Sequence, residues 1–95
     1  MKRTKKLIVG NWKMNPESLE EARKIAGDVK RGMRMIKKTH VVLAPPYVYL
    51  GPLSAVPTNM LFLGAQNAFY ETLGAFTGEV SFTMLPENAP VLVLN

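Results

Sequence analysis

Short apolar runs alternate along the chain with segments of helical periodicity. Four runs of three or four consecutive apolar residues that contain no tyrosine occur, at 7–9, 41–44, 60–63 and 91–94. A strand that is buried on both faces of a parallel sheet has this pattern, whereas a half-exposed strand alternates apolar and polar residues. The pattern therefore predicts four strands, connected by helices and loops.

The segment between the first two runs has the clearest helical pattern. Apolar residues recur there every three or four positions and form one stripe, made of Leu19, Ala22, Ala26, Val29, Met33 and Ile36. Asn15 and Pro16 predict the helix start, because asparagine caps free backbone N–H groups and proline at the first helical position has none to leave unpaired. Acidic residues near the start and basic residues near the end suit the helix dipole.

The remaining segments predict shorter elements. We expect a short helix or turn over about 47–56, a long loop over 66–77 and a short helix over about 79–85. Strands that alternate with helices form a parallel sheet through right-handed crossovers, so the fold class is α/β. The pattern alone does not separate an open doubly wound sheet from part of a barrel. Because a final apolar strand would leave an unpaired edge, we expect the protein to continue beyond residue 95.

Charge is distributed unevenly. The net charge is +5, yet all twelve lysine and arginine residues lie between Lys2 and Lys38, and residues 41–95 contain three acids and no base. One interpretation is a nucleic-acid surface, since clustered cations displace the counterions of phosphates. We favour a solvated helix face, because the bases at 23–38 are interleaved with acidic and apolar residues and no aromatic residue is available there for base stacking.

Several classes of protein fit the sequence poorly. Only three apolar residues follow the basic start, too few for a signal peptide, and no window approaches the ~18 apolar residues of a membrane span. The absence of cysteine fits a reducing compartment, and no metal-ligand spacing occurs. The only histidine, His40, stands at the amino end of a predicted strand, where we expect an ordinary, partly exposed residue. The expectation is a cytoplasmic protein without metal or membrane contact.

Polar residues follow three of the predicted strands directly, in segments 10–15, 44–47 and 64–67. Active groups of α/β proteins gather at the carboxyl ends of parallel strands. These segments contain one cation and several neutral amides. Such a set suits an anionic, oxygen-rich ligand such as a sugar phosphate.

The same segments resemble a known family. They read Val9-Gly-Asn-Trp-Lys-Met-Asn15, Leu43-Ala-Pro-Pro-Tyr47 and Gly64-Ala-Gln-Asn67, and Gly74-Ala-Phe-Thr-Gly-Glu-Val-Ser81 follows them. Their order and spacing resemble those of triose-phosphate isomerases. The resemblance implies an eight-stranded parallel (β/α) barrel, the TIM barrel of ~250 residues. Residues 1–95 would be the N-terminal portion of that single domain, with four strands and three helices. The implied reaction is the cofactor-free interconversion of glyceraldehyde 3-phosphate and dihydroxyacetone phosphate in glycolysis and gluconeogenesis.

The resemblance also assigns roles to individual residues. Lys13 would be catalytic and would bind the substrate, holding a positive charge near its phosphate and the oxygen that becomes negative during the reaction. Asn11 would donate a hydrogen bond to the substrate. Gln66 would belong to the supporting shell beside Lys13.

A second set of residues would form a subunit interface. The family's loop that corresponds to Gly74–Ser81 extends into the neighbouring subunit of a homodimer, so Phe76, Thr77, Gly78 and Glu79 would lie in that interface. Glu79 would form an ion pair with an arginine beyond residue 95. The alternative for Phe76–Glu79 is a turn and helix cap, with Thr77 as the N-cap.

The sequence also departs from the family pattern. No residue here matches the family's catalytic histidine or its glutamate base, so the 95-residue chain is expected to be inactive alone. Expected partners are the triose phosphate and either a second subunit or a complementing C-terminal half-barrel, with no nucleic acid. The alternatives are a basic module that binds phosphate or nucleic acid, and a barrel fragment with a structural role.

Overall fold

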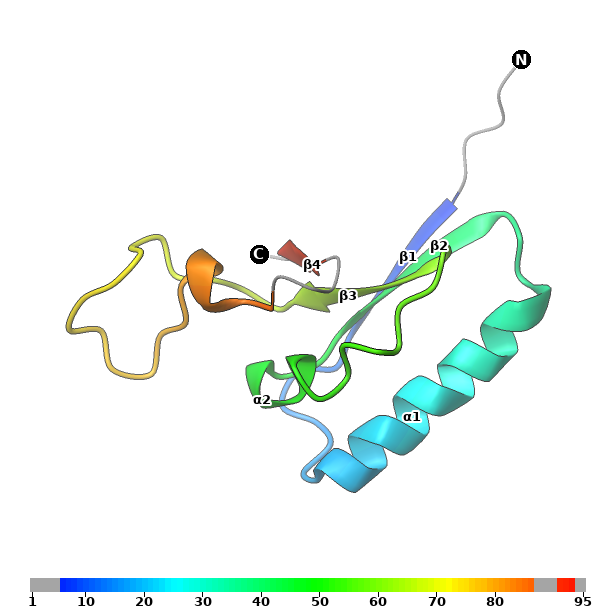
Figure 1. The fold of residues 1–95 in the computed structure, drawn as a ribbon, viewed down its shortest axis with the longest axis horizontal. Helices are drawn as coiled ribbons and strands as arrows, with labels where there is room; N and C mark the ends of the chain where they lie inside the picture. Colours follow the sequence, from blue (N-terminus) through cyan, green and yellow to red (C-terminus); the bar gives the residue numbers. More distant parts are fainter. Residues whose placement is uncertain (1–5, 87–90, 94–95) are drawn as a thin grey trace, which may run out of the picture.

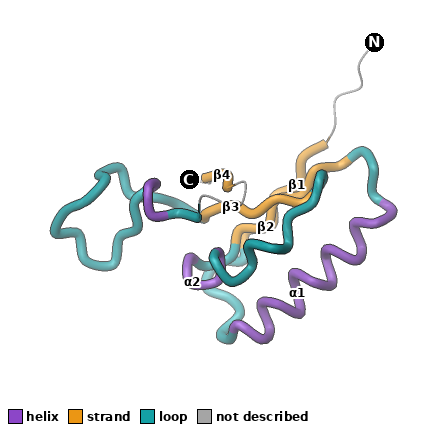
Figure 2. The backbone as a smooth tube through the Cα atoms, viewed as in Figure 1, coloured by secondary structure: helices purple, strands orange, loops and turns teal. Residues whose placement is uncertain are grey.

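The computed structural model describes residues 6–86 and 91–93 and contains one parallel sheet (Figures 1 and 2). The sheet order is β1-β2-β3-β4, so each strand pairs with its neighbour in the sequence. The strands are β1 (Lys6–Asn11), β2 (Thr39–Ala44), β3 (Leu61–Ala65) and β4 (Val91–Val93). The predicted parallel α/β arrangement is confirmed. The predicted fourth strand also included residue 94, which lies outside the described residues.

Helix α1 (Leu19–Gly32) follows β1, and its start differs from the prediction. Ser18, not Asn15, is the N-cap, and its hydroxyl oxygen accepts a hydrogen bond from the Glu21 N–H at 3.2 Å. Serine and asparagine satisfy a free N–H about equally well, so composition alone does not choose between them. The choice of Ser18 leaves residues 12–17 free to form a loop after β1.

The apolar stripe of α1 packs on the sheet. Ala22 and Ala26 are fully buried, and these small side chains allow the helix to lie close to the strands. The helix ends before the stripe does, because Met33–Met35 form a 3₁₀ turn (η1) and Ile36 is extended. The main core cluster also includes Leu43, Tyr49, Leu50, Leu53, Leu61, Leu63 and Ala65. The core therefore lies between the sheet and its helices.

The later connections contain little helix. Residues 47–56 form the one-turn helix α2 (Tyr47–Leu50) and a series of turns, as predicted. The helix predicted over 79–85 is wrong, because only the 3₁₀ turn η2 (Phe82–Met84) forms there. Ser81 instead makes a parallel β-bridge with Phe69, whose N–H donates to the Val80 carbonyl at 2.8 Å. This pairing keeps residues 80 and 81 extended.

The helices cover one face of the sheet and leave part of it bare. Helices α1 and α2 lie on the same side (Figure 1), where Leu43 and Leu63 face them in register. The edge strand β1 is poorly covered, since Leu7 and Ile8 are 59% and 56% exposed. Three adjacent apolar residues on an open strand edge usually mark a surface that another element covers.

No helix within residues 6–86 and 91–93 is long and apolar enough to cross a membrane.

Candidate active site at the carboxyl ends of the strands

Three segments that sequence analysis singled out meet at the carboxyl ends of β1, β2 and β3. The Ala44 carbonyl at the end of β2 accepts a hydrogen bond from the Trp12 N–H at 3.0 Å and another from the Gln66 side-chain amide at 2.8 Å. The same Gln66 Nε2 donates to the Lys13 carbonyl at 2.9 Å. Residues from three different strand ends thus share one small network, which we call the rim.

Lys13 has an unusual backbone conformation within the rim. Its φ is +57°, in the left-handed region that residues with a side chain rarely adopt. Two hydrogen bonds hold it there, because the Asn11 Oδ1 atom accepts from the Lys13 N–H at 2.8 Å while Gln66 binds the Lys13 carbonyl. Such a conformation costs of order 1–3 kcal/mol and persists where the surrounding contacts impose it. The Lys13 side chain itself is exposed, and no ion pair involves it within the described residues.

Two further contacts fix the loop after β1. The Asn15 side-chain amide donates to the Trp12 carbonyl at 3.2 Å. The phenol of Tyr49, a buried residue of α2, donates to the Pro16 carbonyl at 2.8 Å. The loop that carries Lys13 is therefore attached to β2, α2 and β3 at once.

Tyr47 connects the loops that follow β2 and β3. Its hydroxyl donates to the Asn67 carbonyl at 2.6 Å and contacts the Asn67 side-chain oxygen as well. Burial raises the pKa of the Tyr47 phenol, and the negative charge of Glu79 raises it further. The phenol therefore stays protonated at neutral pH and remains a hydrogen-bond donor.

The loop after β3 extends away from the sheet, as the yellow and orange segment of Figure 1 shows. Gly74 and Gly78 have φ values of +144° and +82°, which favour glycine. A β-carbon at Gly74 would lie 2.6 Å from the Phe76 ring. The turn and the ring therefore fit together only because residue 74 has no side chain. Phe76 also packs on Phe69, with ring centroids 4.6 Å apart. The loop is thus organised by its own aromatic contacts.

The interface residues predicted in this loop lie on its surface. Phe76, Thr77, Gly78 and Glu79 are all exposed, and the Glu79 N–H closes a turn on the Phe76 carbonyl at 3.1 Å. The predicted turn is confirmed. The predicted N-cap at Thr77 is wrong, because no helix follows it. In the described part of the chain, no hydrogen bond or ion pair joins these four residues to Asn11 or Lys13.

Sequence analysis missed some contributors to the rim. It named no individual role in the site for Tyr47, Tyr49 or Asn67, yet both tyrosines use their hydroxyl groups to connect loops. The position of each tyrosine after a strand end was the only available signal. His40 is partly exposed, as expected. Its ring makes a T-shaped contact with the ring of Phe62, with the ring centroids 5.4 Å apart.

The chemistry of the rim is limited by its residue types. Lys13 supplies one cation, while Asn11, Gln66, Asn67 and Tyr47 are neutral. This set can bind an anion and stabilise negative charge, but it includes no carboxylate that could act as a base. Within the described residues, no group of three or more His, Asp or Glu side chains could hold a metal ion.

Comparison with known proteins identifies the family. The model of the family "Triosephosphate isomerase" matches residues 6–94. The triosephosphate isomerase of Dehalococcoides mccartyi is 37% identical over 89 residues, which are 93% of this chain and 35% of the relative. The enzyme of Coprinopsis cinerea is 40% identical over 74 residues, or 78% of this chain and 29% of the relative. The enzyme of Chloroflexus aurantiacus is 41% identical over 80 residues, which are 83% of this chain and 32% of the relative.

The chain spans about a third of the length of the curated relatives that it matches. Because the match covers nearly all of the chain at this level of identity, the chain belongs to the triosephosphate isomerase family.

Proposed function

We propose that residues 1–95 form the N-terminal portion of a single eight-stranded parallel (β/α) barrel. Four parallel strands in sequential order, with helices on one face, are what one half of such a barrel contains. The exposed apolar side chains of β1 support the proposal, because barrel closure would pair that edge with the last strand. The length of the relatives leaves room for the other strands.

The function proposed for the whole barrel is the interconversion of glyceraldehyde 3-phosphate and dihydroxyacetone phosphate without a cofactor. Lys13 would contact the substrate phosphate and stabilise the oxygen that becomes negative when the enediolate forms. Asn11 would donate a hydrogen bond to a substrate oxygen. The observation that carries the proposal is the imposed left-handed conformation of Lys13, held between Asn11 and Gln66.

Gln66 would act as a positioning residue. Its amide bridges the carbonyls of Lys13 and Ala44, so it fixes the peptide that carries Lys13 relative to the end of β2. A positively charged side chain placed in advance stabilises developing charge without reorganising during the reaction.

The proposal includes a homodimer that uses the loop after β3. Phe76, Thr77, Gly78 and Glu79 are exposed on a loop that leaves the sheet, and Leu73 and Tyr70 expose further apolar surface beside them. Large exposed apolar residues on an ordered loop are typical of protein contacts. We place this dimer in the cytoplasm, in keeping with a chain that contains no cysteine.

A chimera tests the proposed activity. Residues 6–94 replace the matched segment of the Dehalococcoides mccartyi enzyme, and a coupled assay measures isomerase activity. We expect the chimera to be active and the 95-residue chain alone to show no activity above background, because its rim contains no carboxylate to remove the substrate proton.

A second version of the experiment mixes the 95-residue chain with the remaining two-thirds of the Dehalococcoides mccartyi enzyme. The same coupled assay then measures the isomerase activity of the mixture. Activity of the isolated chain would show that another group acts as the base. A folded chimera with no activity would contradict the proposed role of the rim. A module that binds nucleic acid, the alternative from the charge distribution, is not favoured by the family match.

A further inference from the structure

The end of the sheet opposite the rim carries a groove lined partly by basic residues. This groove of about 830 Å³ separates the end of α1 and η1 from residues 58–60, which precede β3. Four of its lining residues are basic, namely Lys30, Arg31, Arg34 and Lys37, and none is acidic. We call it the basic groove. Because it lies at the amino ends of the strands, it is separate from the groups around Lys13.

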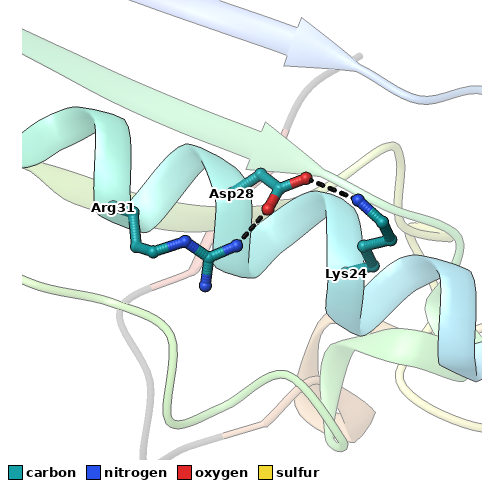
Figure 3. Close-up of polar contacts among 3 residues, drawn as sticks. All are labelled: Lys24, Asp28 and Arg31. Carbon is teal, nitrogen blue, oxygen red and sulfur yellow. Dashed lines mark hydrogen bonds and ion pairs between the residues drawn. The ribbon is translucent and has the colours of Figure 1, made fainter.

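The ion pairs of α1 leave most of this charge uncompensated. Asp28 binds both Lys24, at 3.1 Å, and Arg31 (Figure 3). A hydrogen bond from Lys24, together with the charges of Lys24 and Arg31, lowers the pKa of Asp28, so its carboxylate is ionised at neutral pH. Arg34 and Lys37 form no ion pair within the described residues. The carboxyl end of α1 contributes only about half a negative charge through the helix dipole. The four basic residues of the groove outweigh this charge.

The walls of the groove are connected and partly apolar. The Lys30 ammonium donates to the Ala55 carbonyl at 3.2 Å and thereby joins α1 to the segment before β3. Met33, Ile36 and Met60 supply apolar surface on both walls. The Thr58 oxygen accepts hydrogen bonds from the N–H groups of residues 60 and 61, both at 3.2 Å, which leaves its hydroxyl proton free to donate to a ligand.

We propose that the basic groove binds a compact polyanion with adjacent phosphoryl groups, either a free polyphosphate or the phosphate tail of a nucleotide. Arg34 and Lys37, which have no acidic partner in the described part of the chain, would contact neighbouring phosphoryl groups through charge-assisted hydrogen bonds. The volume falls in the range of small-molecule sites. The lining contains no aromatic side chain, so it offers no platform on which the bases of a nucleic-acid strand could stack.

The test is a titration of the ¹⁵N-labelled 95-residue chain with tripolyphosphate and, separately, with ATP, at low ionic strength. We expect shifts in the amides of residues 27–37 and 58–60. The double variant Arg34→Glu/Lys37→Glu should bind at least about tenfold more weakly, because it removes two charge-assisted hydrogen bonds. The matched control Arg23→Glu/Lys24→Glu makes the same change of charge on helix α1, outside the groove, and should retain affinity within about twofold.

The neutral variant Arg34→Gln/Lys37→Gln, checked by circular dichroism, keeps the test valid if charge reversal impairs folding. Tighter binding of ATP would assign the groove to nucleotides, and equal or tighter binding of tripolyphosphate would assign it to free polyphosphate. The proposal is overturned by an absence of shifts at millimolar ligand or by equal weakening in both charge-reversed variants. Shifts confined to residues 11–15 and 66 would also overturn it, and would leave the isomerase proposal intact.

Discussion

Replacing Lys13 by alanine lowers the kcat/KM of the isomerase chimera by about 10²–10³-fold, the loss typical of removing one group that stabilises a developing oxyanion. The physical reason is that the Lys13 ammonium is the only cation at the rim, where its peptide is held by Asn11 and Gln66. We expect kcat to fall as well as KM to rise, because the charge contacts both the phosphate and the reacting oxygen. Steady-state kinetics in both directions measure the effect.

The control for this variant is Lys24→Ala in the same chimera. Lys24 is an exposed lysine of α1 that pairs with Asp28, so its loss removes an equal charge from a residue that makes no hydrogen bond to the rim within the described residues. Its kcat/KM should stay within about twofold of the parent, since exposed ion pairs contribute little. Similar losses for Lys13→Ala and Lys24→Ala would show that overall charge matters and that Lys13 has no specific contact with the substrate.

Replacing Leu63 by alanine destabilises the 95-residue chain by about 2–5 kcal/mol, the cost of deleting a buried leucine side chain and leaving a cavity. Leu63 is 0% exposed and lies on β3, opposite Leu43 and against the helices. The free energy of unfolding of a natural domain is only roughly 5–15 kcal/mol. We therefore expect the urea midpoint, followed by circular dichroism, to fall sharply or the chain to unfold.

Leu73→Ala provides the matched control, because the same atoms are removed from a side chain that is 78% exposed. Its stability should change by no more than about 0.5 kcal/mol. Equal urea midpoints for Leu63→Ala and the parent chain, or the absence of any cooperative transition in the parent chain, would contradict the assignment of the core to the space between β3 and the helices.

Most of the sheet could be predicted from the sequence because its strands are short apolar runs. Residues 41–44 and 60–63 match β2 and β3 to within a few positions, and parallel pairing follows from the alternation with helices. The apolar stripe predicted most of α1 equally well. These signals are local, and burial on the sheet reinforces them.

The errors occurred where one segment has two acceptable local structures. Both Asn15 and Ser18 can cap a helix, and the contacts of the loop after β1 with Tyr49 and Gln66 favour the later start. Residues 79–85 were predicted to be helical, yet the pairing of Phe69 with Ser81 holds part of that segment extended. That pairing connects residues twelve positions apart, which no local pattern reports.

Three members of the rim were predictable, but its geometry was not. The family resemblance pointed to Asn11, Lys13 and Gln66, and the structure brings all three together. The left-handed conformation of Lys13 has no sequence signal, since lysine does not favour it. It depends on hydrogen bonds from residues two and 53 positions away, which only the folded chain supplies.

The most direct test of the central claim is a crystal structure of the chimera with a triose phosphate bound. We expect the Lys13 Nζ atom and the Asn11 side-chain amide to lie within hydrogen-bonding distance of the ligand's oxygen atoms, about 2.7–3.2 Å. A ligand bound elsewhere, with the Lys13 ammonium directed into solvent, would contradict the account.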